Sequence, residues 1–160
     1  MGALLLSISA VSAQMKIGYV NSQDLLADLP EVKQAQANLK SLEQQLQKKG
    51  QGMVEALQKK YAQLQQKEQQ GMLAPKEIET QAAKLKQEEL KLGQFQQQMQ
   101  EQLLKKQQEL MEPVINKIKA AIAEVAKENG YTYILDNSAG MVLYGDSSYD
   151  VSALVKAKLK

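Results

Sequence analysis

The chain has 160 residues, an aromatic content of 4%, one phenylalanine and no tryptophan, which leaves little material for a compact globular core. It contains no histidine and no cysteine, which excludes imidazole bases, thiolate nucleophiles, disulfides and the ordinary ligand sets for zinc, iron or copper. The formal net charge is only +2, and lysine and glutamate are mixed along the middle of the chain, as on a solvated helix face. An elongated, largely helical protein that is not an enzyme is therefore expected.

Residues 1–13 resemble a secretory signal peptide. An apolar run over residues 3–11 is followed by Ser12 and Ala13, whose small side chains stand where a signal peptidase inspects the chain. The basic segment that normally precedes such a run is missing, so this signal peptide can be incomplete, and the start of a strand or helix is the alternative. The run is shorter than the roughly 20 apolar residues of a membrane span, and no later segment approaches that length, so no transmembrane helix is expected.

A short strand and a short helix are predicted next. Residues 16–20 are β-branched and aromatic, which predicts a strand with Ile17 and Tyr19 on one face. Leucines at helical spacing then predict a helix over residues 23–29. Pro30 is tolerated at the first position of a helix, so a second and much longer helix is predicted to open there.

A long antiparallel helical hairpin is predicted over residues 31–112, with its tip at residues 71–75. The tip carries a glycine and then a proline, in the order that ends one helix and begins the next. Apolar residues of the first arm recur at steps of three, four or seven, namely Leu39, Leu42, Leu46, Met53, Leu57, Tyr61 and Leu64. The second arm has a strict seven-residue repeat of Ile78, Leu85, Leu92 and Met99, with a companion seam of Ala82, Leu103 and Leu110.

The hairpin is expected to bend more easily than an ideal coiled coil. Polar residues fall on predicted seam positions where leucine is expected, namely Glu89, Gln96 and Lys106. Gly50 and Gly52 lie where the stripe of the first arm is weakest, and each glycine costs about 1 kcal/mol relative to alanine inside a helix. Pro113 removes one backbone hydrogen bond and predicts a kink. These three residues are the candidate hinges.

The remaining residues predict a small body that contains β-structure. A dense aliphatic stripe after residue 113 ends at Asn129 and Gly130, and strands are predicted over residues 131–136 and 141–144, joined as a hairpin. Asp150 is expected to cap a last helix whose inward residues are Val151, Leu154 and Val155. The predicted fold is thus α+β and predominantly α, with a body of three or four short strands and short helices formed by residues 14–30 and 113–160. So small a core with unpaired strand edges favours self-association.

Five segments together resemble the Skp/OmpH family, and the resemblance covers essentially the whole mature chain. They are Lys-Ile-Gly-Tyr-Val-Asn at 16–21, Asp-Leu-Leu at 24–26, Asn-Gly-Tyr-Thr-Tyr-Ile-Leu-Asp at 129–136, Gly-Met-Val-Leu-Tyr-Gly at 140–145 and Asp-Val-Ser-Ala-Leu-Val at 150–155. The resemblance implies a periplasmic chaperone of a Gram-negative bacterium that prevents aggregation of unfolded outer-membrane proteins without ATP or any cofactor.

The resemblance also implies a jellyfish-like homotrimer. The strands of three subunits would build a central body, and three helical hairpins would surround a cavity that receives the client. Candidate residues of the trimerisation body are Ile17, Tyr19, Val20, Tyr133, Ile134, Leu135, Met141, Val142 and Leu143. The best-known members are strongly basic and this chain is not, so a lipopolysaccharide site is not carried over.

Scattered apolar residues of the arms are the candidate client contacts, because an unfolded membrane barrel exposes alternating apolar side chains in water. The candidates are Met53, Leu57, Tyr61, Met72, Leu73, Leu90, Phe95 and Met99. The alternative is that such residues hold the arms together, which applies best to Leu64, Leu85 and Leu92. Met72, Leu73, Leu90 and Phe95 are expected to lie off the seam.

Other classes of function fit the sequence less well. A nucleic-acid binder needs a basic stripe with stacking aromatic residues, and the arms have neither. Lysine pairs at 48–49, 59–60 and 105–106 allow weak contact with a membrane surface, although they also fit a role in solubility. The serious rival is a periplasmic structural or adaptor coiled coil that links envelope complexes.

Overall fold

The computed structural model describes residues 15–160, so the predicted signal peptide lies outside the described residues. The elements in chain order are β1 (Ile17–Val20), α1 (Ser22–Ala27), α2 (Pro30–Gln69), α3 (Pro75–Asn129), β2 (Tyr133–Asp136), a 3-10 turn (Ser147–Tyr149) and α4 (Ser152–Leu159). The chain divides into a hairpin unit, Pro30–Val114, and a small unit that combines the described residues up to Leu29 with Ile115–Lys160. Within residues 15–160, no helix combines the length and the apolar character that crossing a bilayer requires.

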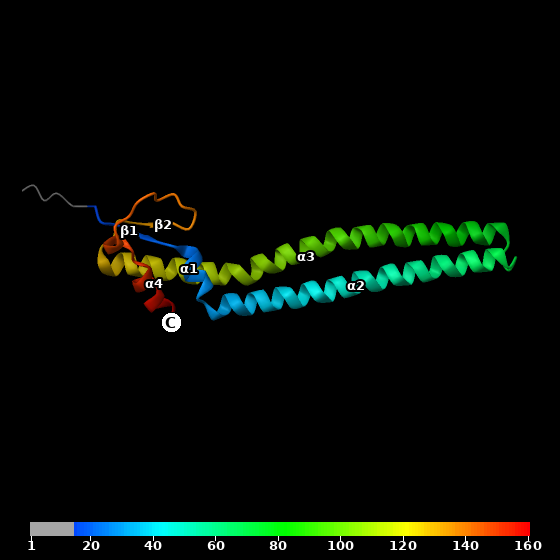
Figure 1. Cartoon of the computed structure of the whole chain (residues 1–160), viewed down its shortest axis with the longest axis horizontal. Helices are drawn as coiled ribbons and strands as arrows, with labels where there is room; N and C mark the ends of the chain where they lie inside the picture. Colours follow the sequence, from blue (N-terminus) through cyan, green and yellow to red (C-terminus); the bar gives the residue numbers. More distant parts are fainter. Residues whose placement is uncertain (1–14) are drawn as a thin grey trace, which may run out of the picture. The chain divides into compact units, whose positions relative to one another are not determined.

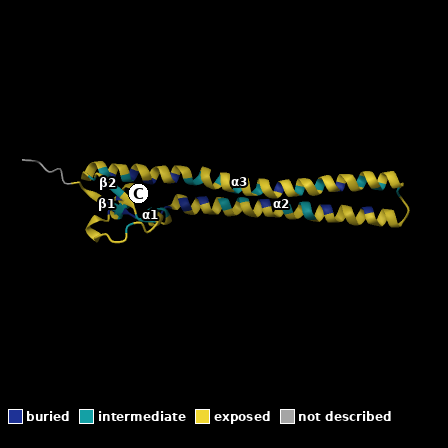
Figure 2. Cartoon of the chain, turned by 90° about the horizontal axis from the view of Figure 1, so that it is seen from above, coloured by how far each residue is buried: buried dark blue, intermediate teal, exposed yellow. Residues whose placement is uncertain are grey.

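The hairpin unit pairs α2 with the first part of α3. The two helices run side by side in opposite directions in both views of the chain (Figure 1 and Figure 2). Pro30 is the first residue of α2, as predicted, because a residue at that position needs no backbone N–H for the helix. The predicted helical hairpin is therefore confirmed.

The reversal between the two helices has its hydrogen bonds satisfied locally. Gly71 adopts a φ of 69°, and its N–H donates to the carbonyl of Glu68 while the N–H of Met72 donates to the carbonyl of Lys67. These bonds satisfy carbonyls that the end of α2 would otherwise leave without partners. At the start of α3, the Glu77 carboxylate accepts a hydrogen bond of 2.8 Å from the N–H of Ala74.

Buried positions recur along both helices of the hairpin, while most of the surface is exposed (Figure 2). The buried residues of the hairpin unit are Val32, Ala35, Leu46, Leu57, Leu64, Leu85, Phe95 and Val114. The predicted companion seam is wrong by one residue over part of α3. Gln81 and Glu88 are half-buried and Phe95 is buried, whereas Ala82, Glu89 and Gln96 are exposed. The true companions thus lie three residues after Ile78, Leu85 and Leu92, and not four.

The small unit is built on a parallel pair of strands. β1 pairs with β2 in a register that places Ile17 beside Tyr133 and Tyr19 beside Leu135. One face of β1 is buried, through Gly18 and Val20. The buried hydrophobic residues of this unit are Val20, Leu25, Leu29, Ile118, Ala121, Val125, Val151, Val155 and Leu159.

The predicted β-hairpin at the end of the chain is wrong. Residues 141–144 form no strand, and the described chain has two strands, not three or four. The other side of β1 is taken instead by a single bridge between Tyr19 and Asp150, in which the N–H of Val151 donates to the carbonyl of Tyr19. In the described chain β2 has β1 on one side and no strand on the other, so its outer edge stays free and residues 141–144 do not pair with it.

The last helix begins slightly later than predicted and faces the core differently. The Asp150 carboxylate accepts a hydrogen bond of 2.8 Å from the N–H of Ser152, the first residue of α4. Leu154 is 44% exposed, so the expectation that it faces inward is wrong. The buried residues are Val151, Val155 and Leu159, since a spacing of four keeps them on one side of the helix.

Candidate functional site

Large apolar side chains are exposed at separate points of the hairpin unit. Met72 in the turn is 68% exposed, and Leu90 and Leu104 on α3 are 62% and 58% exposed. Covering such surface contributes roughly 25 cal/mol per Å² of apolar area removed from water. Scattered contacts of this kind suit a partner that has no fixed shape, because none of them demands one particular geometry.

The structure separates the predicted client-contact residues into three groups. Met72, Leu90 and Tyr61 are exposed, Leu57 and Phe95 are buried, and Met53, Leu73 and Met99 are partly buried. Leu73 packs against a buried cluster of Leu57, Leu64 and Leu85. The expectation that Leu73 and Phe95 lie off the seam is therefore wrong, and both help to hold the arms together.

Leu104 is an exposed apolar residue that the sequence analysis missed. It lines a groove of about 630 Å³ between α2 and α3, together with Gln36, Leu39, Lys40, Glu43, Gln100, Leu103 and Gln107. The available signal was the adjacent pair Leu103 and Leu104, because consecutive helical residues point roughly 100° apart and only one of them can point straight at the partner helix. Leu103 is half-buried, which leaves Leu104 outside.

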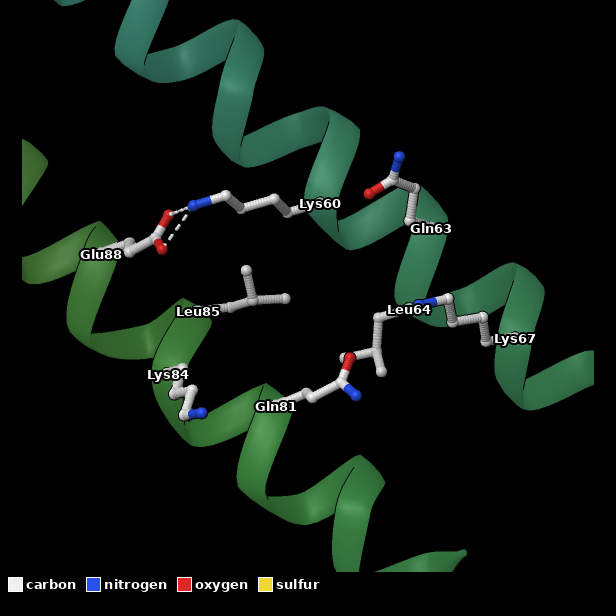
Figure 3. A pocket seen from close by; sticks show the side chains of 8 residues that line it. All are labelled: Lys60, Gln63, Leu64, Lys67, Gln81, Lys84, Leu85 and Glu88. Carbon is white, nitrogen blue, oxygen red and sulfur yellow. Dashed lines mark hydrogen bonds and ion pairs between the residues drawn. The ribbon is translucent and has the colours of Figure 1, made fainter. Parts of the chain in front are cut away.

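An exposed ion pair joins the two arms of the hairpin. The Lys60 ammonium on α2 lies 2.6 and 2.7 Å from the two carboxylate oxygens of Glu88 on α3, beside Leu64 and Leu85 (Figure 3). An exposed ion pair of this kind is worth about 0–1 kcal/mol. The Lys60–Glu88 pair therefore adds little to the stability of the hairpin, and its main effect is to favour one register between the two helices.

Tyr61 on α2 lies near the negative Glu89 carboxylate of α3. Loss of hydration raises the pKa of the Tyr61 hydroxyl, and the interaction with Glu89 raises it further. The phenol therefore stays protonated in neutral solution. A client contact at Tyr61 would use the ring, which is part of a residue 38% exposed.

The candidate hinge residues lie inside continuous helices. Gly50 and Gly52 are within α2, and Pro113 is within α3. Proline lacks the N–H that would bond to the carbonyl of Glu109, one turn earlier. Bending at these three places stays a prediction.

The outer face of the two-stranded sheet is apolar and exposed. Ile17, Tyr133 and Leu135 are 40%, 55% and 45% exposed, and the strand register places them on one face with the half-buried Tyr19. Of the other residues predicted for the trimerisation body, Val20 is buried in the core, and Ile134 and Val142 are half-buried. Met141 and Leu143 are 77% and 97% exposed.

Asp136 connects the end of β2 to the start of α1. Its carboxylate accepts bonds of 3.1 and 2.6 Å from the N–H and hydroxyl of Ser22, and one of 2.9 Å from the N–H of Ser138. Partial burial alone would raise the pKa of Asp136, but these hydrogen bonds to the charged form hold it below its ordinary value.

Acidification is expected to remove the stabilising effect of Asp136. A pKa that is lower in the folded than in the unfolded state gives stability above the unfolded pKa, and this stability is lost as pH falls through the folded pKa. At neutral pH, Asp136→Asn should lower the urea midpoint of the small unit. The amide nitrogen that replaces one carboxylate oxygen cannot accept the hydrogen bond that the Ser22 hydroxyl donates. The difference from wild type should shrink as pH falls below the ordinary aspartate value of 3.8 and vanish once pH has passed the lower pKa of the folded state, as followed by tyrosine fluorescence. A deficit that persists in strong acid would contradict this account.

These observations define a class of protein with an antiparallel helical hairpin unit and a small parallel α/β unit. The outer membrane protein (OmpH-like) family matches residues 16–159, so the chain belongs to that family and the resemblance in sequence is confirmed. A solved OmpH-like protein of Caulobacter crescentus CB15, named as a candidate outer membrane chaperone, has the same fold with a TM-score of 0.77. It is 22% identical, and the match covers 98% of this chain and 90% of that one. No curated protein matches the chain.

Proposed function

We propose that the protein is a holdase chaperone that binds unfolded outer-membrane proteins through its helical hairpin and prevents their aggregation without ATP. The observation that carries this proposal is the exposure of Met72, Leu90 and Leu104 on an otherwise polar hairpin. Side chains of this size cost free energy in water, and an unfolded membrane barrel has many apolar side chains to cover them. Membership of the OmpH-like family and the name of the Caulobacter protein support the same function.

The proposed location is the periplasm of a Gram-negative bacterium. The signal-like pattern of residues 1–13 supports export, and the proposed clients cross the periplasm on their way to the outer membrane. The hairpin, residues 31–112, would hold the client, and residues 14–30 and 113–160 would form the trimerisation body. Contact of the hairpin with a membrane surface would be weak, because its charges are nearly balanced.

The test is suppression of aggregation. An outer-membrane barrel protein unfolded in urea is diluted into buffer with and without the purified mature protein, and light scattering is followed. Suppression at one trimer per client is expected. Scattering that is the same with and without the protein would refute the proposal and favour the adaptor coiled coil.

We also propose that three copies associate through the apolar outer face of the sheet. Ile17, Tyr133 and Leu135 are exposed on this face in the single chain. A unit this small buries only a small share of its surface, and association of copies would increase that share. The face is next to a strand edge, which a second copy can extend.

Leu135→Lys should convert the trimer into a monomer in analytical ultracentrifugation, because a charge would have to be buried at the contact. Ala139→Lys adds the same charge at an exposed residue just beyond β2 and should leave the trimer intact. A wild-type protein that sediments as a monomer would refute the association itself. Equal sedimentation of wild type and Leu135→Lys would exclude this face.

A further inference from the structure

The ring of Phe95 on α3 packs against Gly50 on α2, which has no side chain to crowd it. It is the only phenylalanine of the chain and is 7% exposed. A Cβ atom added to Gly50 on α2 would lie 3.3 Å from Cε1 and 3.8 Å from Cδ1 of the Phe95 ring. The Lys49 ammonium lies 5.1 Å from the centroid of the same ring. The ring is thus packed against the backbone of α2 where glycine leaves room for it.

Two further glycines lie close to this contact in sequence, and packing does not explain them. Gly52 follows Gly50 by two residues, and Gly93 precedes Phe95 by two. A Cβ at Gly52 or Gly93 would meet nothing within 4 Å. Because glycine is a poor helix former, both helices are intrinsically weak at this level of the hairpin.

We propose that Phe95 is a positioning residue that controls bending of the hairpin. With its ring against Gly50, Phe95 holds α2 and α3 together at the level where the glycines weaken them. When the ring leaves Gly50, the arms bend there and adapt to the size of the client. The inference rests on the proposed holding function and names the contact that regulates it.

Alanine substitutions at the glycines test the contact by the sign of their effects. Gly52→Ala and Gly93→Ala should raise the thermal midpoint by about 2–4 °C each, because alanine favours the helix and nothing obstructs its Cβ. Gly50→Ala makes the same change in helix propensity but crowds the Phe95 ring, which has to shift by a few tenths of an ångström, so it should lower the midpoint or leave it unchanged. In a Phe95→Leu background, Gly50→Ala should become stabilising like the other two. Equal stabilisation by all three alanines in the wild-type background would overturn the proposal.

A distance measurement tests bending directly, in the free protein. The chain has no cysteine, so spin labels can be attached to Gln44→Cys and Gln66→Cys, which are exposed on α2 and roughly 33 Å apart along a straight helix. Labelled chains are diluted with unlabelled ones to remove distances between subunits. Phe95→Ala should broaden the distribution of distances along α2, although the substituted residue lies on α3 and the sequence of α2 is unchanged. Leu85→Ala, which opens the buried cluster instead, should not broaden it.

An unchanged width in Phe95→Ala, or equal broadening in Leu85→Ala, would overturn the proposal. Neither result depends on a client, so the proposed chaperone function would stand or fall separately, on light scattering. Addition of an unfolded barrel protein to the wild type should then broaden the distribution towards that of Phe95→Ala. A distribution unchanged by a bound client would refute the link between this contact and holding.

Discussion

Replacing Met72, Leu90 and Leu104 together by serine is expected to remove most of the protein's ability to suppress aggregation while its hairpin stays folded. These side chains are 68%, 62% and 58% exposed, so their loss leaves no cavity in the seam. Full burial of one such side chain is worth about 1.5–3 kcal/mol, and 1.4 kcal/mol is a factor of ten in affinity. The protein concentration needed for half suppression of light scattering should therefore rise by about tenfold or more.

The matched control replaces three exposed glutamines by serine, namely Gln65, Gln97 and Gln108. These changes have a similar effect on helix propensity but remove no large apolar surface. The control should keep wild-type activity, and both variants should keep the far-ultraviolet circular dichroism of the wild type. If the glutamine variant loses as much activity as the apolar variant, exposed apolar contact does not carry client binding.

Leu25→Ala is expected to destabilise the small unit by about 2–5 kcal/mol, as large-to-small changes in a core do. Leu25 is fully buried, and so are Val125 and Val155 in the same unit. Of the six tyrosines only Tyr61 lies in the hairpin unit, so tyrosine fluorescence follows unfolding of the small unit in urea. The helical signal at 222 nm is dominated by α2 and α3 and should change less.

Leu154→Ala is the control for that change. Leu154 belongs to the same unit but is 44% exposed, so its truncation should cost well under about 1 kcal/mol. Fluorescence midpoints that fall equally for Leu25→Ala and Leu154→Ala would contradict the assignment of the core. A midpoint for Leu25→Ala that matches wild type would contradict it as well.

The seam of the hairpin shows what an apolar repeat can and cannot predict. A repeat of Ile78, Leu85 and Leu92 is strong enough to predict a helix packed along one line. Its companion line can follow after three residues or after four, and both choices here consist mostly of polar side chains. Phe95 was the one strongly apolar residue that favoured the correct choice. The exposed apolar residues of the hairpin were only partly predicted: Leu90 and Met72 were among the predicted client contacts, and Leu104 was not.

The strands show a different limit. Residues 17–20 form a strand because a partner strand, β2, lies beside them and Gly18 and Val20 are buried against the core. Residues 141–144 have an equally suitable composition, yet Leu143 is 97% exposed and no strand forms. In the described chain the outer edge of β2 is free, so an edge was available and residues 141–144 do not use it. Local composition therefore indicates that a segment can form a strand, and not whether it pairs with one.

The parallel pairing of β1 with β2 also sets the order in which the chain can fold. Contacts of the small unit join residues as far apart as Tyr19 and Val151, which are linked by a backbone hydrogen bond and separated by 132 positions. Helices α2 and α3, in contrast, can pair progressively from the turn at Gly71, where each new contact closes only a short loop. Once the hairpin has formed, the loop left to close is roughly 30 residues, and each halving of a loop saves about 0.6 kcal/mol of closure entropy. Preventing the hairpin from forming, without shortening the chain, would therefore slow assembly of a sheet that contains none of the hairpin's residues.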